Sequence, residues 1–370
     1  MQSRPPLFVP GLATLAAVKL GVHLATASGY GIFRDELYYL ACADHLGFGY
    51  VDHAPLIGWT TWLARALFGT SLLGLRLLPA LAGTATLVLS VQLSRALGGG
   101  KWAQLLTGVC VLVSGYQLAV SHLLTMNVFE PTLWTAAALL LHSALRSGKT
   151  ASWMGFGAVA GIGLLNKHSM VFFGFALVVA LLLSRDRRVF LGWRPWAAFA
   201  LALLLLSPNL IWQMAHGWPT LEFMSSARAG KHATFTVLGF LKEQVLLAHP
   251  LTLPVWLGGV VHSLWRRDDA HAHFVGASYL VLFCLVLFAG GKPYYLAPIV
   301  PIVYAAGGVA FERICSAPRR RFVIPALSAL LLATGALLSP LALPVLSQPR
   351  LASYARTLGV LPSSGERHEI

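Results

Sequence analysis

The sequence has 370 residues, of which 57% are hydrophobic and only 11% charged, and its formal net charge is +14. Soluble domains carry about 25% charged residues, so this composition excludes an ordinary soluble globule. Several apolar runs approach the roughly 20 residues that cross a bilayer, which predicts an all-α polytopic membrane protein. The four cysteines are scattered and predict neither a disulfide framework nor a zinc site.

The apolar segments predict eleven spans in chain order. The first follows a basic start without a convincing cleavage site, so we interpret it as a retained span rather than a signal peptide. These segments make up a transmembrane domain over residues 1–345, and residues 346–370 form a short polar tail. The spans are expected near 8–28, 72–94, 103–121, 129–146, 152–166, 169–184, 195–215, 238–264, 274–290, 294–312 and 322–345.

The basic residues predict the orientation. With the N-terminus in the cytoplasm, the cytoplasmic segments hold 15 basic residues and four acids, as the positive-inside rule requires. This rule accounts for the positive charge without nucleic acid. Eleven spans then place the C-terminus and two long segments, 29–71 and 216–237, on the outer side of a bacterial cytoplasmic membrane.

The first outer segment contains an unusual group of acids. Asp35 and Glu36 are adjacent, so on a helix they face different directions and should have different roles. Arg34 beside Asp35 favours its ionised form. Asp52 and His53 follow just before the chain returns to the membrane, whereas Asp44 is interpreted as a solvated surface acid.

Two ionisable residues fall inside the first span. Lys19 and His23 are four residues apart and share a helical face. Ionisable groups within a membrane are candidates for function, although either side chain could instead extend to an interface. The second outer segment combines aromatic and charged residues, including Arg228 and Lys231, and is expected to close over a bound substrate.

A family resemblance rests on seven motifs in order. They are "RDELYYL", "GYVDHAPLIGW", "RLLPALAGTAT", "HLLTMNVFEPTLW", "GIGLLNKHSMVFFG", "PNLIWQMAHGWPTLEF" and "GGKPYYLAPIVP". Together they span about residues 30–312. This pattern resembles polyprenol-phosphate-dependent glycosyltransferases of the GT-C fold, in particular glycosyltransferase family 39, which includes protein O-mannosyltransferases and aminoarabinose transferases.

The resemblance implies an active site on the outer face, with Asp35 as the catalytic base in the Asp35–Glu36 pair. It further implies that Asp52 lies near a metal, that His53 lies near the lipid phosphate, and that Glu130, with Asn127 one turn earlier, lines the site. The family's Pro-Pro turn is replaced here by Ala54-Pro55.

The implied chemistry needs a base for an acceptor hydroxyl and positive charge near a departing lipid phosphate. Direct displacement would invert the anomeric carbon. A divalent metal held by Asp52 and His53 is possible from ligand type alone. The candidate phosphate contacts are Arg34, His53, Lys167, Arg228, Lys231, Lys242 and Lys292, with Tyr294 and Tyr295 as hydroxyl donors.

For two of these lysines, a role in anchoring the protein at the membrane interface is an alternative to a role in the site. Lys292 beside two tyrosines is typical of an interfacial anchor, and Lys167 could extend toward the headgroups. A second class of function, a transporter or flippase of lipid-linked sugars, would favour midplane charges and internal repeats. The sequence does not specify the sugar, or whether the acceptor is a lipid, a glycan or a protein.

Overall fold

The structure, a computed structural model, describes residues 5–229, 236–265 and 270–359. These residues form α-helices and short 3₁₀ helices, with no strand among them. The first half contains α1 (Val9–Thr26), α2 (Arg34–Asp44), α3 (Leu56–Phe68), α4 (Leu72–Ala96), α5 (Lys101–Val113), α6 (Gly115–Val120), α7 (Met126–Ser147), α8 (Thr150–Asn166) and α9 (Met170–Leu182).

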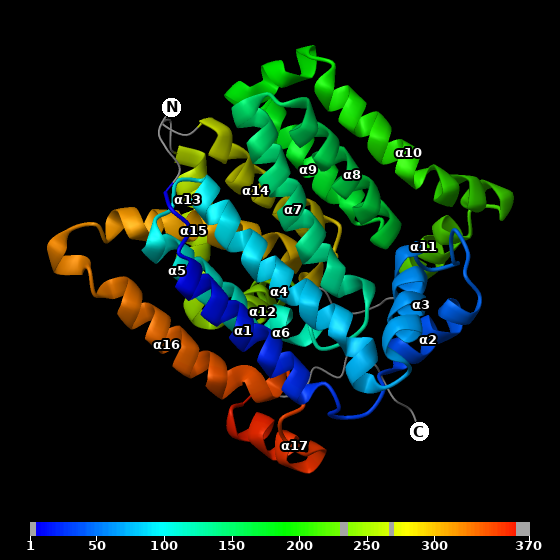
Figure 1. Cartoon of the computed structure of the whole chain (residues 1–370), viewed down its shortest axis with the longest axis horizontal. Helices are drawn as coiled ribbons and strands as arrows, with labels where there is room; N and C mark the ends of the chain where they lie inside the picture. Colours follow the sequence, from blue (N-terminus) through cyan, green and yellow to red (C-terminus); the bar gives the residue numbers. More distant parts are fainter. Residues whose placement is uncertain (1–4, 230–235, 266–269, 360–370) are drawn as a thin grey trace.

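The second half continues the bundle. Its helices are η1 (Arg185–Leu191), α10 (Arg194–Ala215), α11 (Pro219–Ala229), α12 (Val237–Ala248), η2 (Pro250–Thr252), α13 (Leu253–Trp265), η3 (Ala270–Ala272), α14 (His273–Phe288), η4 (Pro293–Ile299), α15 (Val300–Ile314), η5 (Pro318–Arg320), α16 (Val323–Leu338), η6 (Ser339–Leu341) and α17 (Gln348–Thr357). In Figure 1, α10 and α16 run along opposite margins of the bundle.

Each predicted span coincides with a helix or a pair of helices. By length and composition, six described helical segments can cross a membrane, and a bent pair raises this number to seven. The shorter apolar helices α5, α9 and α14 lie among them. The all-α polytopic fold is therefore confirmed, whereas the number of complete crossings remains a prediction.

The predicted span over 238–264 corresponds to a bent pair of helices. Within it, α12 and α13 meet at an angle of 92°. The break falls at His249, whose φ of +88° is unusual for a residue with a side chain, and at Pro250, which lacks a backbone N–H. A period-based reading could not detect this break because both helices are equally apolar.

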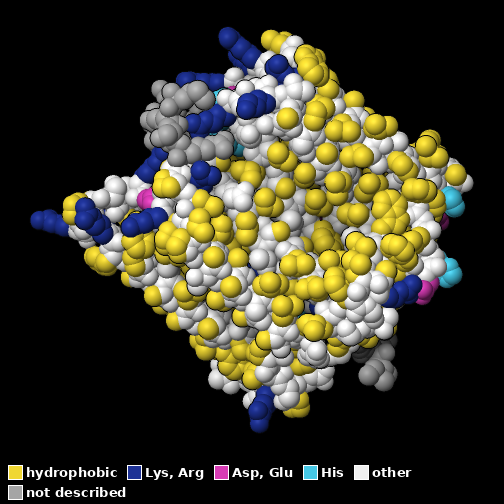
Figure 2. Space-filling model, in the orientation of Figure 1, with side chains coloured by type: hydrophobic (Ala, Val, Ile, Leu, Met, Phe, Trp, Pro, Cys, Tyr) yellow, Lys and Arg dark blue, Asp and Glu magenta, His cyan; other side chains and the backbone are white. Residues whose placement is uncertain are grey.

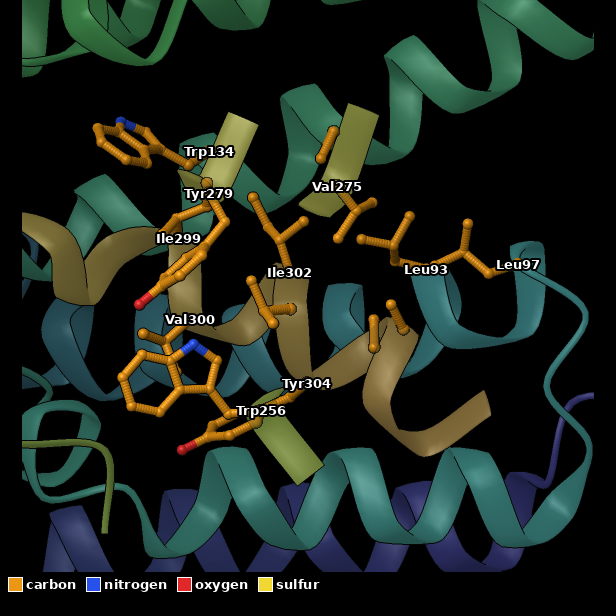
Figure 3. Close-up of a cluster of buried hydrophobic side chains, with 14 of the residues drawn as sticks. Leu93, Leu97, Trp134, Trp256, Val275, Tyr279, Ile299, Val300, Ile302 and Tyr304 are labelled. Carbon is orange, nitrogen blue, oxygen red and sulfur yellow. The ribbon is translucent and has the colours of Figure 1, made fainter. Parts of the chain in front are cut away.

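The core lies where α15 packs against α13, α5 and α4. Close approach of α13 and α15 depends on Gly259 and Gly307, because a Cβ on either would collide with the facing backbone. Aromatic and aliphatic side chains from several helices complete this core, among them Trp134, Trp256 and Tyr304 (Figure 3). Such packing, rather than helix propensity, holds the scaffold beneath the outer segments.

The short helices α2, α3 and α11 occupy one corner of the molecule (Figure 1). Figure 2 has the same orientation. It shows most of the visible Lys and Arg side chains at the margins away from that corner, toward the α15–α16 turn and the α9–α10 turn. Hydrophobic side chains cover much of the face between these regions. Part of the predicted polar tail is ordered, since α17 is helical and Tyr354 donates to the carbonyl of Leu337 at 2.5 Å.

Candidate active site

The first turn of α2 separates the two adjacent acids. Glu36 is completely buried. Its Oε2 accepts the backbone N–H of Phe33 at 2.8 Å, and its Oε1 accepts that of Leu124 at 3.1 Å. The Asp35 side chain, by contrast, is 38% exposed. The prediction that the two acids have different roles thus agrees with the geometry.

Arg76 is the charged partner of Glu36. Its Nε and Nη2 contact the two carboxylate oxygens at 3.0 and 2.8 Å, in a bidentate pair. The same guanidinium donates to the carbonyls of Ala27, Gly29 and Gly31. Arg76 therefore fastens α4 to the connection between α1 and α2. This connection leads directly into the first turn of α2, where Asp35 lies.

The Glu36 pKa follows from this environment. Burial by itself would raise the pKa of Glu36, but the hydrogen bonds from Arg76, Phe33 and Leu124 outweigh burial and lower it. Glu36 is therefore ionised and saturated with donors. Its assignment to the catalytic residues is corrected to an anchoring role, because no oxygen remains free for an acceptor hydroxyl.

Arg76 was missing from the sequence-based candidates. The available signal was a lone arginine early in the predicted span 72–94. An intramembrane charge of this kind requires a partner. The sequence alone could not identify that partner among the acids of the first outer segment.

Asp52 and His53 make contacts that the sequence did not predict. Tyr38 donates its hydroxyl to Asp52 Oδ1 at 2.6 Å, and burial together with this bond raises the pKa of Tyr38. Asp52 is 32% exposed at its side chain. Tyr39, on the next position of α2, interacts electrostatically with both Asp35 and Asp52. The two acids therefore flank one tyrosine.

His53 is a packed histidine. It is buried among the rings of Tyr38, Tyr39 and Tyr50, with centroids 4.7–5.5 Å away. Its Nδ1 contacts the carbonyl of Ala54 at 2.8 Å, and its Nε2 lies 3.7 Å from Cys42 Sγ. Burial lowers the pKa of His53. The bond from Nδ1 to the Ala54 carbonyl fixes the ring and leaves Nε2 as the acceptor nitrogen.

The proposed metal pair stays a prediction. Asp52 Oδ1 accepts from Tyr38 and lies 3.9 Å from His53 Nε2, which also lies 3.7 Å from Cys42 Sγ. Within the described ranges, no cluster of three His, Cys, Asp or Glu side chains is arranged to hold a metal. We derive no chemical step through a metal.

A second cluster forms at the turn between α8 and α9. Lys167 Nζ donates to Asn127 Oδ1 and Glu130 Oε2, both at 2.9 Å. Ser169 Oγ donates to the other oxygen of the buried Glu130. Lys167 therefore points inward, toward α7, and does not extend toward the headgroups.

The "KPYY" motif completes this cluster. Lys167 Nζ lies 5.8 and 5.6 Å from the ring centroids of Tyr294 and Tyr295, and Lys292 lies 5.7 Å from that of Tyr294. Tyr294 interacts electrostatically with Glu130 and with Asp35. Asp35 of the first outer segment is therefore within electrostatic range of Tyr294.

Four further predicted residues have different outcomes. Arg228 lies in α11, but its side chain is outside the described part of the chain, as is Lys231 altogether. Arg34 is 69% exposed at its side chain and approaches Asp35 at 3.4 Å. Asp44 pairs with Arg65 at 2.7 Å on the surface, in agreement with its interpretation as a solvated acid.

Comparison with known proteins gives the family context. A family described as "Dolichyl-phosphate-mannose-protein mannosyltransferase" matches residues 52–212. A lipopolysaccharide core galacturonosyltransferase, RgtA, from Rhizobium johnstonii is 26% identical over 87% of this chain and 69% of its own length. A polyprenol-phosphate-mannose–protein mannosyltransferase from Corynebacterium glutamicum is 30% identical over 33% of this chain and 26% of its own length.

Solved structures agree on the fold. ArnT from Cupriavidus metallidurans bound to undecaprenyl phosphate superposes with a TM-score of 0.71 and 19% identity, covering 95% of this chain and 69% of ArnT. The Archaeoglobus fulgidus oligosaccharyltransferase AglB, in complex with an inhibitory peptide and a dolichol-phosphate, gives a TM-score of 0.59 at 13% identity, covering 98% of this chain and 56% of AglB.

The fold and the relatives define a polytopic membrane glycosyltransferase with the GT-C architecture. More narrowly, the chain is similar to polyprenyl-phosphate-sugar glycosyltransferases related to glycosyltransferase family 39. The transporter alternative loses its support, because the matched relatives are named as transferases.

Proposed function

We propose that this enzyme transfers a sugar from a polyprenyl-phosphate carrier to an acceptor hydroxyl at the outer surface of the cytoplasmic membrane, with inversion at the anomeric carbon. The observation that supports this most is a partly exposed carboxylate, Asp35, within electrostatic range of Tyr294, whose ring also lies near the ammonium groups of Lys167 and Lys292. A base and an anion-stabilising cluster are the two parts this reaction needs.

Asp35 is the base in this proposal. It accepts the proton of the acceptor hydroxyl as the oxygen attacks the anomeric carbon and the carrier phosphate leaves. Glu36 cannot act as a nucleophile from its buried pair with Arg76, so a two-step retaining route has no second carboxylate at this position.

Lys292 and the two tyrosines are the groups we assign to the carrier phosphate. Lys292 is exposed and stacks on Tyr294, so its ammonium is available to an incoming anion. Lys167 is already paired with Glu130. We assign it to fixing Glu130 and Asn127 at the site, with phosphate contact as a secondary role.

The test is a transfer assay with purified full-length protein and synthetic polyprenyl-phosphate sugars. Galacturonosyl and mannosyl carriers come first, because the relatives carry these sugars in their names. Lipid, glycan and peptide acceptors are compared. Inversion is read from the anomeric coupling of the product.

Asp35→Asn is the decisive variant. We expect kcat to fall by about 10²–10⁴-fold, the typical contribution of a positioned base. Asp44→Asn, which removes the other surface acid of α2, is the matched control and should keep activity. Full activity of Asp35→Asn with intact carrier binding would remove the assignment of the base.

A metal requirement is tested separately. Dialysis against EDTA, followed by assay with and without added Mg²⁺ or Mn²⁺, measures it directly. Loss of transfer that either ion restores would support the metal hypothesis.

A further inference from the structure

A buried polar cluster extends behind Arg76, away from the proposed active site. It consists of Lys19 and His23 on α1, Gln117 on α6 and His122 in the turn before α7. Each side chain is at most 6% exposed. Lys19 precedes the end of α1 by seven residues, or about 10 Å of helix. The proposed transfer reaction uses none of these four residues.

The contacts within the cluster define which groups donate. Lys19 Nζ donates to the carbonyl of Gln117 at 3.0 Å and lies 3.3 Å from His23 Nε2. Arg76 Nη1 lies 3.2 Å from His122 Nε2. An ammonium and a guanidinium only donate, so each imidazole accepts through Nε2 and carries its hydrogen on Nδ1.

These assignments leave an excess of donors. His23 Nδ1, His122 Nδ1 and the Gln117 amide nitrogen have no hydrogen-bond partner among the described residues. Lys19 uses two of its three ammonium hydrogens in the contacts given above. The Gln117 amide oxygen is the one unpartnered acceptor in this group of four side chains. A buried donor left without an acceptor destabilises the folded state.

The charges within the cluster also indicate that a negative group is missing. Lys19 has no carboxylate within salt-bridge distance among the described residues, and Glu36 is already neutralised by Arg76. A buried ammonium without a counter-charge is strongly unfavourable. The side chains of Lys19 and of Ser121, the neighbour of His122, both lie within 4 Å of the position of a Cβ on Gly83, so the donors from α1 and from the α6–α7 turn are near one another.

We propose that Lys19, His23, Gln117 and His122 form a binding site for a small monovalent inorganic anion of the halide class, such as chloride. An acceptor-only ion matches a donor-rich group and supplies the missing negative charge. Such an ion would link α1 to α6 beside His122, which contacts Arg76. It would thereby support the connection between α1 and α2 that precedes Asp35. The proposal does not depend on the transfer reaction.

The first test is thermal unfolding of the full-length protein in detergent, in sodium chloride and in sodium gluconate at equal ionic strength. Ligand that binds only the folded state stabilises it in proportion to the logarithm of 1 + [L]/Kd. We expect Tm to rise with chloride and to stay flat in gluconate. Equal Tm values across both series would overturn the proposal.

Variants locate the effect. Gln117→Leu removes the amide with little change in volume, and we expect it to abolish the chloride-dependent rise in Tm. Lys242→Gln removes an exposed cation on α12 and should leave that rise unchanged. A rise that persists in Gln117→Leu would place any chloride elsewhere.

A second measurement needs no variant. Crystals grown in bromide should show an anomalous peak between α1 and α6, beside Lys19. Ordered water alone at this position would overturn the proposal, even if the protein is stabilised by chloride.

Discussion

The clearest lesson at the residue scale comes from Asp35 and Glu36, which are neighbours in sequence and differ in every physical respect. Glu36 has four donors and no exposed surface, whereas Asp35 keeps much of its side chain accessible. The resemblance implied that Asp35 is the base of the pair. The structure gives the two acids different environments, which support our proposal that Glu36 anchors the segment and Asp35 is the base.

Removal of either member of the Arg76–Glu36 pair should destabilise the enzyme. Arg76→Met leaves a buried carboxylate without its cation, and such losses typically cost about 3–5 kcal/mol. The double variant Arg76→Met/Glu36→Met should recover part of that stability, because no unpaired charge remains. Denaturant unfolding in detergent for the four members of the cycle measures the coupling.

Activity separates anchoring from simple stability. In the folded double variant we expect kcat to remain low. The connection between α1 and α2, which precedes Asp35, has lost its hydrogen bonds to Arg76. Wild-type kcat in a stable double variant would show that the pair does not position the base.

His53 predicts a pH dependence of stability. Its folded pKa lies below the ordinary 6.5 because burial opposes the charged ring. The unfolded state therefore binds a proton more readily, and stability from this residue is present above pH 6.5 and lost as the pH falls below it. His53→Phe should flatten the acid side of the Tm profile, and an unchanged slope would contradict the assigned burial.

At the scale of elements, the outer segments are positioned by tightly packed helices. Gly259 and Gly307 allow α13 and α15 to approach backbone to backbone, and α15 packs in turn on α4, which carries Arg76. The 92° bend between α12 and α13 directs α12 away from the axis of α13 and against η4, which begins at the "PYY" of the site. The position of Tyr294 therefore depends on the packing of α12 and α13, which are distant in sequence from the acids of α2.

Gly307→Ala tests this dependence. The added Cβ would collide with the carbonyl of Val255, and overpacking of this kind costs about 1–3 kcal/mol. Gly174→Ala on α9 is the control, since a Cβ there meets nothing within 4 Å. Unfolding in detergent should rank Gly307→Ala below wild type and Gly174→Ala at or above it.

For the whole molecule, the distribution of charge agrees with the proposed orientation. The basic turns η1 and η5 lie far from the corner that holds α2, α3 and α11 (Figures 1 and 2). Lys and Arg favour the cytoplasmic side, so that corner is assigned to the outer side.

Cysteine labelling tests the orientation. Asp35→Cys should react with a membrane-impermeant reagent added to intact cells, whereas Arg320→Cys should react only after permeabilisation. Cys284 is exposed on the apolar helix α14, so Cys284→Ser serves as the background for both. Reaction of position 35 solely from the cytosolic side would reverse the proposed topology.

The sequence by itself determined the membrane class, the apolar helices and the acid-rich segment 29–71, because hydropathy and charge are properties of single residues and their neighbours in the chain. It also supplied the ordered motifs that the relatives share. Only the tertiary structure decided that Glu36 pairs with Arg76, that His53 is packed among tyrosines, and that Lys167 points inward to Glu130. These outcomes depend on distances between residues remote in sequence, which a one-dimensional pattern does not contain.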